Sequence, residues 1–456
     1  MPLHVRCPPG LARAGARPFR HDAVYPLSQE LREIPRAEHG IARKAISRNA
    51  LKVTETLQQA GFKAYIVGGA ARDVLLGVTP KDFDVGTDAT PEEVRSLFRS
   101  ARLIGRRFRL AHVRFGRDII EVATFRGLTE DGEDGDRTVE AGGRVLRDNV
   151  FGGSEAEDAR RRDFTANALM YDPSKETLRD YVGGYDDILA NRLRLIGDPV
   201  ERYREDPVRM LRAIRFVTKL GMEMDPATEA PITELAPLLG DIPPARLLDE
   251  LLKLLLGGRA WEGFRGLVRH GLWEPLFPEL LDDPADPGAL IEQALQNTDE
   301  RVAQGKPVTP GFLFASLFWP TVRAEADRRI ENGQPPVEAL AVAGDKAFDR
   351  YTRTVAVHRR FSTMAKEIWM FQPRFERRRG KRAARLLSEK RFRAAYDFLL
   401  LRALEDPSLK EMADWWTRVQ EVDAETRNDM IFGGKGGADG KRPPRKRKPR
   451  NKAENP

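Results

Sequence analysis

Hydrophobic and polar positions change their spacing several times along the first two hundred residues of the chain. Short apolar runs indicate buried strands, and stretches with apolar residues every three or four positions indicate amphipathic helices. Strands are predicted at four runs: Tyr65–Val67, Asp82–Val85, Leu110–Phe115 and Ile119–Phe125. Helices are predicted at residues 41–60, 70–76, 90–99, 157–171 and 201–221. This mixture predicts an α+β unit with a small mixed sheet.

The second half of the chain shows only helical spacing. From Pro226 onward helices are predicted at residues 242–256, 261–270, 289–296, 310–326, 337–347, 351–371, 382–402 and 409–420. We therefore expect a mixed-sheet head followed by an all-α neck and body. The expected segments are a basic, largely disordered N-terminal segment (1–40), a head (41–195), a neck (196–258), a body (259–425) and a disordered basic tail (426–456).

Composition narrows the class of protein. The 456 residues suffice for two or three domains, and a hydrophobic content of 41% supports real cores. No run of about 18 apolar residues occurs, so we expect neither a membrane span nor a membrane partner. The single cysteine, Cys7, fits a reducing cytoplasm. The net charge of +8 suits a polyanion such as nucleic acid, although charge alone would not exclude a merely basic protein.

Two acidic residues carry the first candidate chemistry. Asp82 and Asp84 lie two residues apart in a predicted strand, where positions i and i+2 face the same side. Carboxylates that share a face repel each other unless a cation lies between them, and Mg²⁺ prefers oxygen ligands. Two such ions could activate a hydroxyl and stabilise leaving pyrophosphate. The alternative is a solvated acidic loop.

A glycine pair precedes these acids. Gly68 and Gly69 separate the first strand from a helix that carries Arg72 near its start. Glycine lets the backbone approach a ligand closely, and the N–H groups at a helix start favour phosphate. Either motif alone is weak, and a plain turn is the alternative reading. Together they predict a site that holds triphosphate beside metal.

Two polar clusters in predicted helices are further candidates. Arg162, Asp163 and Asn167 could present a cation, a carboxylate and an amide to triphosphate, ribose or a reacting 3′-OH, or could form a surface ion-pair cluster. Asp206 and Arg209, at i and i+3, share a helix face and place a carboxylate acceptor beside a guanidinium donor. A plain intrahelical ion pair is the alternative for the second cluster.

Three basic stretches could meet phosphate oxygens of RNA. The candidates are Arg106, Arg107 and Arg109 in the head, Arg378, Arg379, Lys381 and Arg382 in the body, and Arg445, Lys446 and Arg447 in the tail. The body stretch has few acids, and the tail has nine Lys or Arg residues between Gly433 and Pro456. A tail that serves solubility alone is the competing interpretation.

The motifs, taken in order, resemble a known family. The pattern G-G-x-x-R-D at Gly68 followed by D-x-D at Asp82 resembles the nucleotidyltransferases of DNA polymerase β type. More narrowly, it resembles bacterial poly(A) polymerases and CCA-adding tRNA nucleotidyltransferases. The string GRRFRLAHVRFG (105–116) and the basic tail are closer to the bacterial poly(A) polymerases. RRDFT (161–165) resembles a motif of the family as a whole, and the resemblance runs from about Ile34 to about Gln420.

The resemblance implies roles for individual residues. Glu121 matches a third carboxylate of the metal site, Asp163 matches an active-site aspartate, and Asp206 and Arg209 match residues that contact the incoming base. It implies a nucleotidyltransferase head of polymerase β type, two Mg²⁺ ions and ATP as substrate. RNA 3′ ends are the expected partner, RNA-decay proteins are considered as others, and a monomer is expected.

The expected activity is template-independent adenylyl transfer to RNA, with release of pyrophosphate. CCA addition to tRNA is the first alternative, because the base-contacting motif does not separate the two. A catalytically silent RNA-binding protein is the second.

Overall fold

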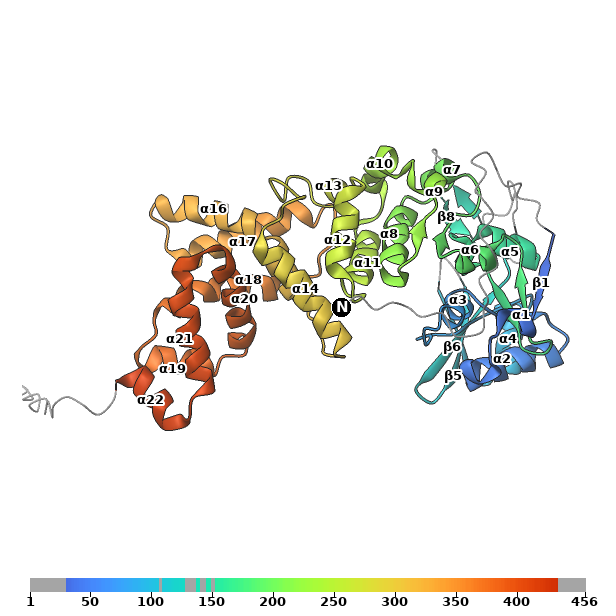
Figure 1. Cartoon of the computed structure of the whole chain (residues 1–456), viewed down its shortest axis with the longest axis horizontal. Helices are drawn as coiled ribbons and strands as arrows, with labels where there is room; N and C mark the ends of the chain where they lie inside the picture. The colour runs from blue at the N-terminus through green and yellow to red at the C-terminus, as the bar shows by residue number, and fades with distance from the viewer. Residues whose placement is uncertain (1–29, 106–108, 128–136, 140–144, 149–151, 434–456) are drawn as a thin grey trace, which may run out of the picture. The chain divides into compact units, whose positions relative to one another are not determined.

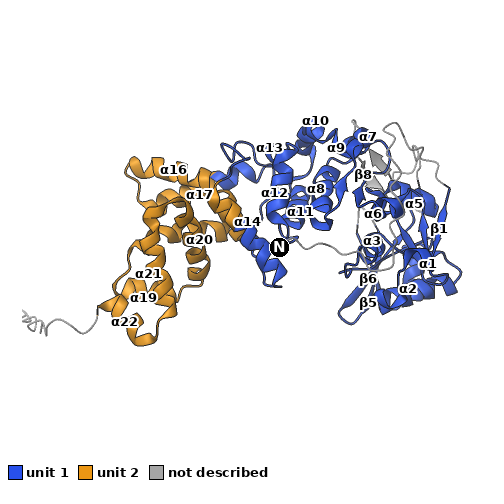
Figure 2. Ribbon diagram, in the orientation of Figure 1, with its two compact units in different colours: residues 1–287, 294–310, 347–358 blue, residues 288–293, 311–346, 359–456 orange. Residues whose placement is uncertain are grey.

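The computed structural model describes residues 30–105, 109–127, 137–139, 145–148 and 152–433. These residues form two compact units (Figure 2). The first unit holds the described residues through Pro287 together with Ala294–Pro310 and Ala347–His358. The second holds Gly288–Gln293, Gly311–Lys346 and the described residues from Arg359 onward. No helix within the described ranges is long and apolar enough to cross a membrane.

An eight-stranded mixed sheet forms the core of the head (Figure 1). Its strands, in spatial order, are β1 (Arg32–Pro35), β10 (Thr177–Asp180), β9 (Met170–Asp172), β2 (Ala64–Val67), β3 (Asp84–Thr87), β6 (Asp118–Thr124), β5 (Leu110–Phe115) and β4 (Ala101–Ile104). Only β3 and β6 pair in parallel; the other neighbours are antiparallel. All four residues of β2 are buried, as their apolar run predicted. The mixed-sheet head is therefore confirmed.

Short helices and two small ladders complete the head. The helices are α1 (Arg36–His39), α2 (Arg48–Gln59), α3 (Gly69–Leu75), α4 (Pro91–Leu97), α5 (Glu155–Arg161) and α6 (Gly184–Leu189), with 3₁₀ helices η1 (Arg43–Ala45) and η2 (Thr165–Asn167). The ladders pair β7 (Arg137–Val139) with β8 (Val145–Asp148), and β11 (Arg192–Leu193) with β12 (Glu223–Met224). At the start of α4, Thr90 and Glu93 form a reciprocal capping box, as the T-P-E-E sequence favours.

The remaining described chain is helical, as predicted. Its helices are α7 (Pro199–Glu205), α8 (Val208–Leu220), α9 (Pro226–Glu229), α10 (Ile232–Leu235), α11 (Pro244–Leu255), α12 (Ala260–Arg269), α13 (Trp273–Leu276), α14 (Ala289–Ala303), α15 (Pro310–Leu317), α16 (Trp319–Glu331), α17 (Pro336–Tyr351), α18 (Arg359–Phe371), α19 (Gly380–Leu387), α20 (Phe392–Glu405), α21 (Lys410–Glu421) and α22 (Ala424–Phe432). The 3₁₀ helices η3 (Ala236–Asp241), η4 (Gln372–Glu376) and η5 (Pro407–Leu409) connect some of them.

Several predicted elements differ from the structure. The helices predicted at 310–326, 351–371 and 382–402 each contain a break, and residues 426–432, expected in the disordered tail, belong to α22. The strand expected at Asp82 begins at Asp84, because its partner strand β2 ends opposite that residue, where the chain turns at Gly68. Asp82 therefore precedes the strand. Residues 32–39, expected to be disordered, form β1 and α1 because Ile34 is fully buried and β1 pairs with β10.

The two long helices predicted at 157–171 and 201–221 are each interrupted. The first ends at Arg161, since Arg162 is extended and the buried Phe164 forms a bridge with Leu195 in place of a helical turn. The second breaks into α7 and α8 at Pro207, whose missing N–H ends a helix and whose ring forces the preceding residue to be extended.

Close packing of α6 against η2 generates a stability prediction. A Cβ added at Gly184 would lie 2.1 Å from the carbonyl oxygen of Thr165, so the backbone would have to move. Gly184→Ala is expected to lower the free energy of unfolding by about 1–3 kcal/mol, measured by urea denaturation. Gly240→Ala is the control, since its Cβ would meet no atom within 4 Å. Equal losses in both variants would contradict this packing.

Candidate active site

The glycine turn after β2 is flanked by two guanidinium groups. Gly68 has φ +71° and ψ −134°, a conformation that glycine adopts readily. A Cβ at Gly68 would lie 3.2 Å from Nη1 of Arg162, and one at Gly69 would lie 3.2 Å from Nη2 of Arg72. The turn thus lies beside two cations, which suits a bound polyanion.

Each of these arginines is held by a polar partner. Arg162 donates to the carboxylate of Asp158 at 3.0 Å, and also to the carbonyl oxygen of Asn167 at 3.4 Å. Arg72 is almost completely buried and donates to Asp73 at 2.6 Å and to the side-chain oxygen of Asn167. The structure therefore brings Gly68, Gly69, Arg72, Arg162 and Asn167 together.

Asp163 lies behind this group, in a buried ion pair. Its Oδ1 accepts from the backbone N–H of Phe164 and from the amide of Asn167, both at 2.8 Å, and its Oδ2 accepts from Nε of Arg212 at 2.8 Å. Burial opposes ionisation, but Arg212 and these hydrogen bonds hold the pKa of Asp163 well below its usual range. Both oxygens of Asp163 are thus occupied by hydrogen bonds from the protein.

The acidic side of the site lies on two parallel strands. Asp84 is in register with Glu121 on β6, so the two residues stand side by side on adjacent strands. Crowding by protein atoms and the negative charge of Glu121 raise the pKa of Asp84 to about 6, with a smaller contribution from Asp82, although Arg162 opposes the shift. A nearby cation would favour the ionised form of Asp84 and so oppose this shift.

The carboxylates fit Mg²⁺ by their chemistry. Among the described residues, no group of three His, Cys, Asp or Glu side chains forms a ready metal site. Asp84 and Glu121 nevertheless offer hard oxygen donors whose mutual repulsion favours a divalent cation. Sequence reasoning did not find His112, whose Nε2 lies 3.2 Å from a Glu121 oxygen.

Asp206 and Arg209, expected to contact the base, hydrogen-bond to different partners. Asp206 Oδ2 accepts from Arg246 at 2.6 Å, and its buried Oδ1 has no hydrogen-bond partner. Arg209 donates to Glu205 at 2.6 Å and to the carbonyl of Arg202 at 2.8 Å. The alternative interpretation, an ion pair between Asp206 and Arg209, is not found in the described part of the chain, and Oδ1 of Asp206 is a buried acceptor without a protein partner.

Only some of the RNA-binding candidates can be placed. Arg106, Arg107, Arg445, Lys446 and Arg447 lie outside the described residues. In the first unit Arg109 is half-exposed and pairs with Glu92 at 3.2 Å.

In the second unit the basic candidates divide into two kinds. Arg378 pairs with Glu411 at 2.7 Å, whereas Arg379, Lys381 and Arg382 are exposed. The neighbouring aromatic side chains, Phe375 and Phe392, are buried in the core of this unit and so do not offer stacking surfaces.

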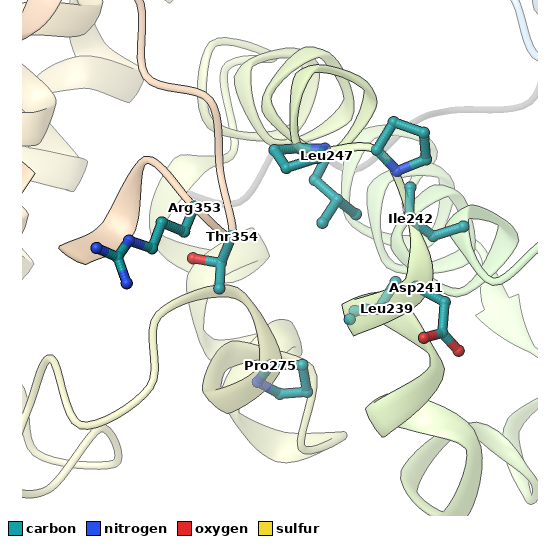
Figure 3. A pocket seen from close by; sticks show the side chains of 10 residues that line it. Leu239, Asp241, Ile242, Leu247, Pro275, Arg353 and Thr354 are labelled. Atoms are coloured by element: carbon teal, nitrogen blue, oxygen red, sulfur yellow. The ribbon is translucent and has the colours of Figure 1, made fainter. Parts of the chain in front are cut away.

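A separate cavity of about 300 Å³ lies in the first unit, between η3, the start of α11, α13 and residues 353–354 (Figure 3). Leu239, Ile242 and Leu247 line it, with Arg353 and Thr354 on the opposite side. None of the candidate site residues lines this cavity.

Sequence reasoning missed Arg212 and Glu250, which support Asp163 from α8 and α11. One signal was present, since Arg212 follows Arg209 by three residues and so shares its helix face. Its partner Asp163 lies 49 residues away, and that pairing has no sequence signature.

Comparison with known proteins identifies the family. Residues 64–194 match the poly A polymerase head domain, residues 221–283 match the probable RNA and SrmB-binding site of polymerase A, and residues 332–452 match the polymerase A arginine-rich C-terminus. Poly(A) polymerase I of Escherichia coli O157:H7 is 50% identical over 400 residues, which cover 85% of each chain. The chain belongs to the bacterial poly(A) polymerase family.

CCA-adding enzymes are more distant relatives of this poly(A) polymerase family member. The enzyme of Bacillus pumilus is 39% identical over 228 residues, or 50% of this chain and 54% of that one. The structure of the Bacillus stearothermophilus CCA-adding enzyme in complex with CTP is 27% identical, has a TM-score of 0.55 and covers 81% of this chain and 82% of its own. The nucleotidyltransferase fold is thereby confirmed.

The crowded carboxylates predict a pH-dependent stability. Because the pKa of Asp84 is raised from 3.8 to about 6, the folded protein holds this proton more tightly than the unfolded chain does. The resulting stabilisation is complete below about pH 4 and is lost as the pH rises through about 6.

Asp84→Asn is therefore expected to raise the free energy of unfolding at pH 8 in the presence of EDTA. The two proteins should converge between about pH 6 and pH 4. Urea denaturation across this range measures the difference. An equal stability of wild type and variant at pH 8 would contradict the electrostatic crowding.

Proposed function

We propose that this protein is a template-independent polynucleotide adenylyltransferase that adds AMP from ATP to RNA 3′ ends. The observation that carries this proposal is the 50% identity to Poly(A) polymerase I over 85% of both chains. The matched region makes up 85% of this chain, which is more than any one of the expected segments. Polyadenylation, rather than tRNA repair, is the activity that this similarity supports.

The proposed contacts with the ATP triphosphate lie at the glycine turn. Arg72 and Arg162, beside Gly68 and Gly69, would meet the oxygens of the triphosphate of ATP. Their partners fix both guanidinium groups before substrate arrives, so little side-chain entropy is lost on binding. This arrangement would hold the α-phosphate where an RNA 3′-OH can attack it in line.

Metal would be held on the opposite side of the phosphates, by Asp82, Asp84 and Glu121. Bound Mg²⁺, expected as two ions, would neutralise phosphate charge and assist the attacking and leaving oxygens. Asp84 and Glu121 stand in register, and Asp82 lies in the loop that leads into the same strand. We assign Asp163 to the support of the site and not to the metal, because its oxygens are occupied by Asn167, Phe164 and Arg212.

Base selection is assigned to Asp206 and Arg209. The unpartnered Oδ1 of Asp206 could accept a hydrogen bond from the exocyclic amine of adenine. Arg246 and Glu205, which hold the two side chains, would limit how far the pocket adjusts to another base.

The wider organisation is proposed on the same basis. The head (41–195) would carry the chemistry, the neck (196–258) would read the base, and the body (259–425) with the basic ends would hold RNA. Arg106, Arg107, Arg109, Arg379, Lys381, Arg382 and the tail residues Arg445, Lys446 and Arg447 would contact phosphates, with Arg378 fixed by Glu411. We further propose a cytoplasmic monomer whose partners include RNA-decay proteins.

A nucleotide-specific extension assay tests the activity. The protein is incubated with Mg²⁺, a short single-stranded RNA and each NTP separately. Long tails with ATP alone are the expected result. Growth limited to tRNA, with use of CTP, would instead indicate CCA addition. No pyrophosphate release with ATP and RNA would indicate a silent RNA-binding protein.

Asp82→Asn tests the metal assignment in the same assay. The variant keeps the shape of the side chain but removes the charge, so adenylyl transfer should fall by at least about 100-fold with RNA binding intact. Filter binding to the same RNA serves as the control. A rate near that of wild type would contradict the assignment of Asp82.

Exposed cations of α19 test the RNA surface. The double variant Lys381→Glu/Arg382→Glu should weaken binding to single-stranded RNA and lower the slope of log affinity against log salt by about 1 to 2. Lys44→Glu/Lys306→Glu carries the same change of charge at exposed positions outside this helix and serves as the control. Equal effects of the two double variants would show that net charge, and not this surface, governs binding.

A further inference from the structure

Arg212 on α8 joins two buried carboxylates that belong to different parts of the first unit. Its Nε and Nη2 donate to Asp163, and its Nη1 lies 3.7 Å from Glu250 on α11. Glu250 is itself 7% exposed at the side chain and also pairs with Arg215 at 3.2 Å and Lys253 at 2.8 Å. The charge of Arg212 is therefore shared between the head and a helix that carries no candidate site residue.

From Asp163 the contacts continue to the glycine turn. The amide of Asn167 donates to Asp163, and its oxygen accepts from Arg72. Nη2 of Arg72 in turn lies 3.2 Å from the position that a Cβ would take at Gly69. An unbroken series of polar contacts thus runs from Glu250 through Arg212, Asp163 and Asn167 to Arg72.

A single aromatic ring reinforces this series. The guanidinium carbons of Arg72, Arg212 and Arg215 lie 5.1, 5.5 and 4.3 Å from the centroid of the Phe216 ring. Phe216 is buried and meets Phe164 edge to face at 5.6 Å. Because three cations share one ring, a shift of Arg212 would disturb the packing of Arg72 as well.

We propose that Glu250 and Arg212 are positioning residues for the triphosphate grip, acting through Asp163 and Asn167 on Arg72 and the glycine turn. This inference rests on the proposed function, because it assigns ATP to that turn. Neither residue needs to touch the nucleotide. Their contribution is to hold the Arg72 guanidinium in the orientation in which it meets phosphate oxygens.

The physical reason is the cost of a buried charge without its partner. Removal of one member of a buried ion pair leaves the other charge poorly compensated, and the neighbouring groups move to find new partners. If Glu250 is neutral, Asp163 is the remaining anionic partner of Arg212. The hydrogen bonds that link Asp163 through Asn167 to Arg72 then rearrange. ATP binding should weaken more than the chemical step slows, because the metal-side carboxylates lie outside this series.

The test measures ATP affinity directly, by calorimetry of the full chain with ATP and Mg²⁺ in the absence of RNA. Glu250→Gln preserves shape and removes the charge, and we expect about tenfold weaker ATP binding. In the extension assay the KM for ATP should rise by the same factor, with kcat reduced less than twofold. Arg212→Lys, which loses the two-pronged hydrogen bond, should act in the same direction.

Glu325→Gln is the matched control. Glu325 on α16 is 13% exposed at its side chain and contacts three cations, Arg328, Arg329 and Lys346, but it belongs to the second unit. The Glu325→Gln variant should bind ATP with the affinity of the wild-type protein. Thermal melting of all variants identifies those that fold, and either Glu250→Gln or Arg212→Lys is sufficient for the test.

A double-variant cycle tests whether Glu250 influences ATP affinity through Asn167. If Glu250 acts through this residue, Asn167→Ala should weaken ATP binding much less in the Glu250→Gln protein than in wild type. Multiplicative effects would overturn the proposal, as would wild-type affinity in folded Glu250→Gln. ATP binding without any adenylyl transfer by the wild type would refute the proposed function alone, because the calorimetric comparison does not depend on catalysis.

Discussion

The arrangement of the site depends on how the mutual repulsion of several neighbouring guanidinium groups is offset by anions. Arg72, Arg162, Arg212 and Arg215 gather between the sheet and α8, and a buried cation is costly unless it is paired. Each has an anionic partner: Asp73, Asp158, Asp163 and Glu250, respectively. These ion pairs and the Phe216 ring fix the orientation of the cations, so the glycine turn meets groups that are already in place.

The acidic side of the same site follows the opposite rule. Asp84 and Glu121 stand in register on parallel strands, and burial together with the negative charge of Glu121 raises the pKa of Asp84. The four arginines are thus paired with carboxylates of the protein, whereas a bound cation would stabilise the ionised forms of Asp84 and Glu121. A magnesium-bound triphosphate would complement both halves, with metal at the carboxylates and phosphate oxygens at the arginines.

Local patterns predicted the parts of the head that depend on neighbouring residues in the chain. The apolar run of β2, the glycine turn and the capping box of α4 each have a short-range signature, and the structure contains all three. Helix interruptions were harder to predict. Pro207 offered a signal that the amphipathic spacing of 201–221 concealed, whereas the end of α5 depends on Phe164, whose bridge to Leu195 is a long-range contact. The pairing of Asp163 with Arg212 likewise depends on packing between the head and α8, and no residue pattern encodes it.

The basic stretch of the body shows why a count of charges overstates a binding surface. In sequence, residues 374–393 form one dense run of arginines and lysines with only two acids. In the structure, ion pairs occupy part of that run: Arg374 with Glu389, Arg378 with Glu411, Arg391 with Glu367 and Arg393 with Asp397. Three of these acids, Glu411, Glu367 and Asp397, lie outside residues 374–393. The sequence alone therefore does not show that they pair with arginines of this stretch. An RNA strand would meet the remaining exposed cations, among them Arg379, Lys381 and Arg382, while the paired arginines stabilise the helices that present them.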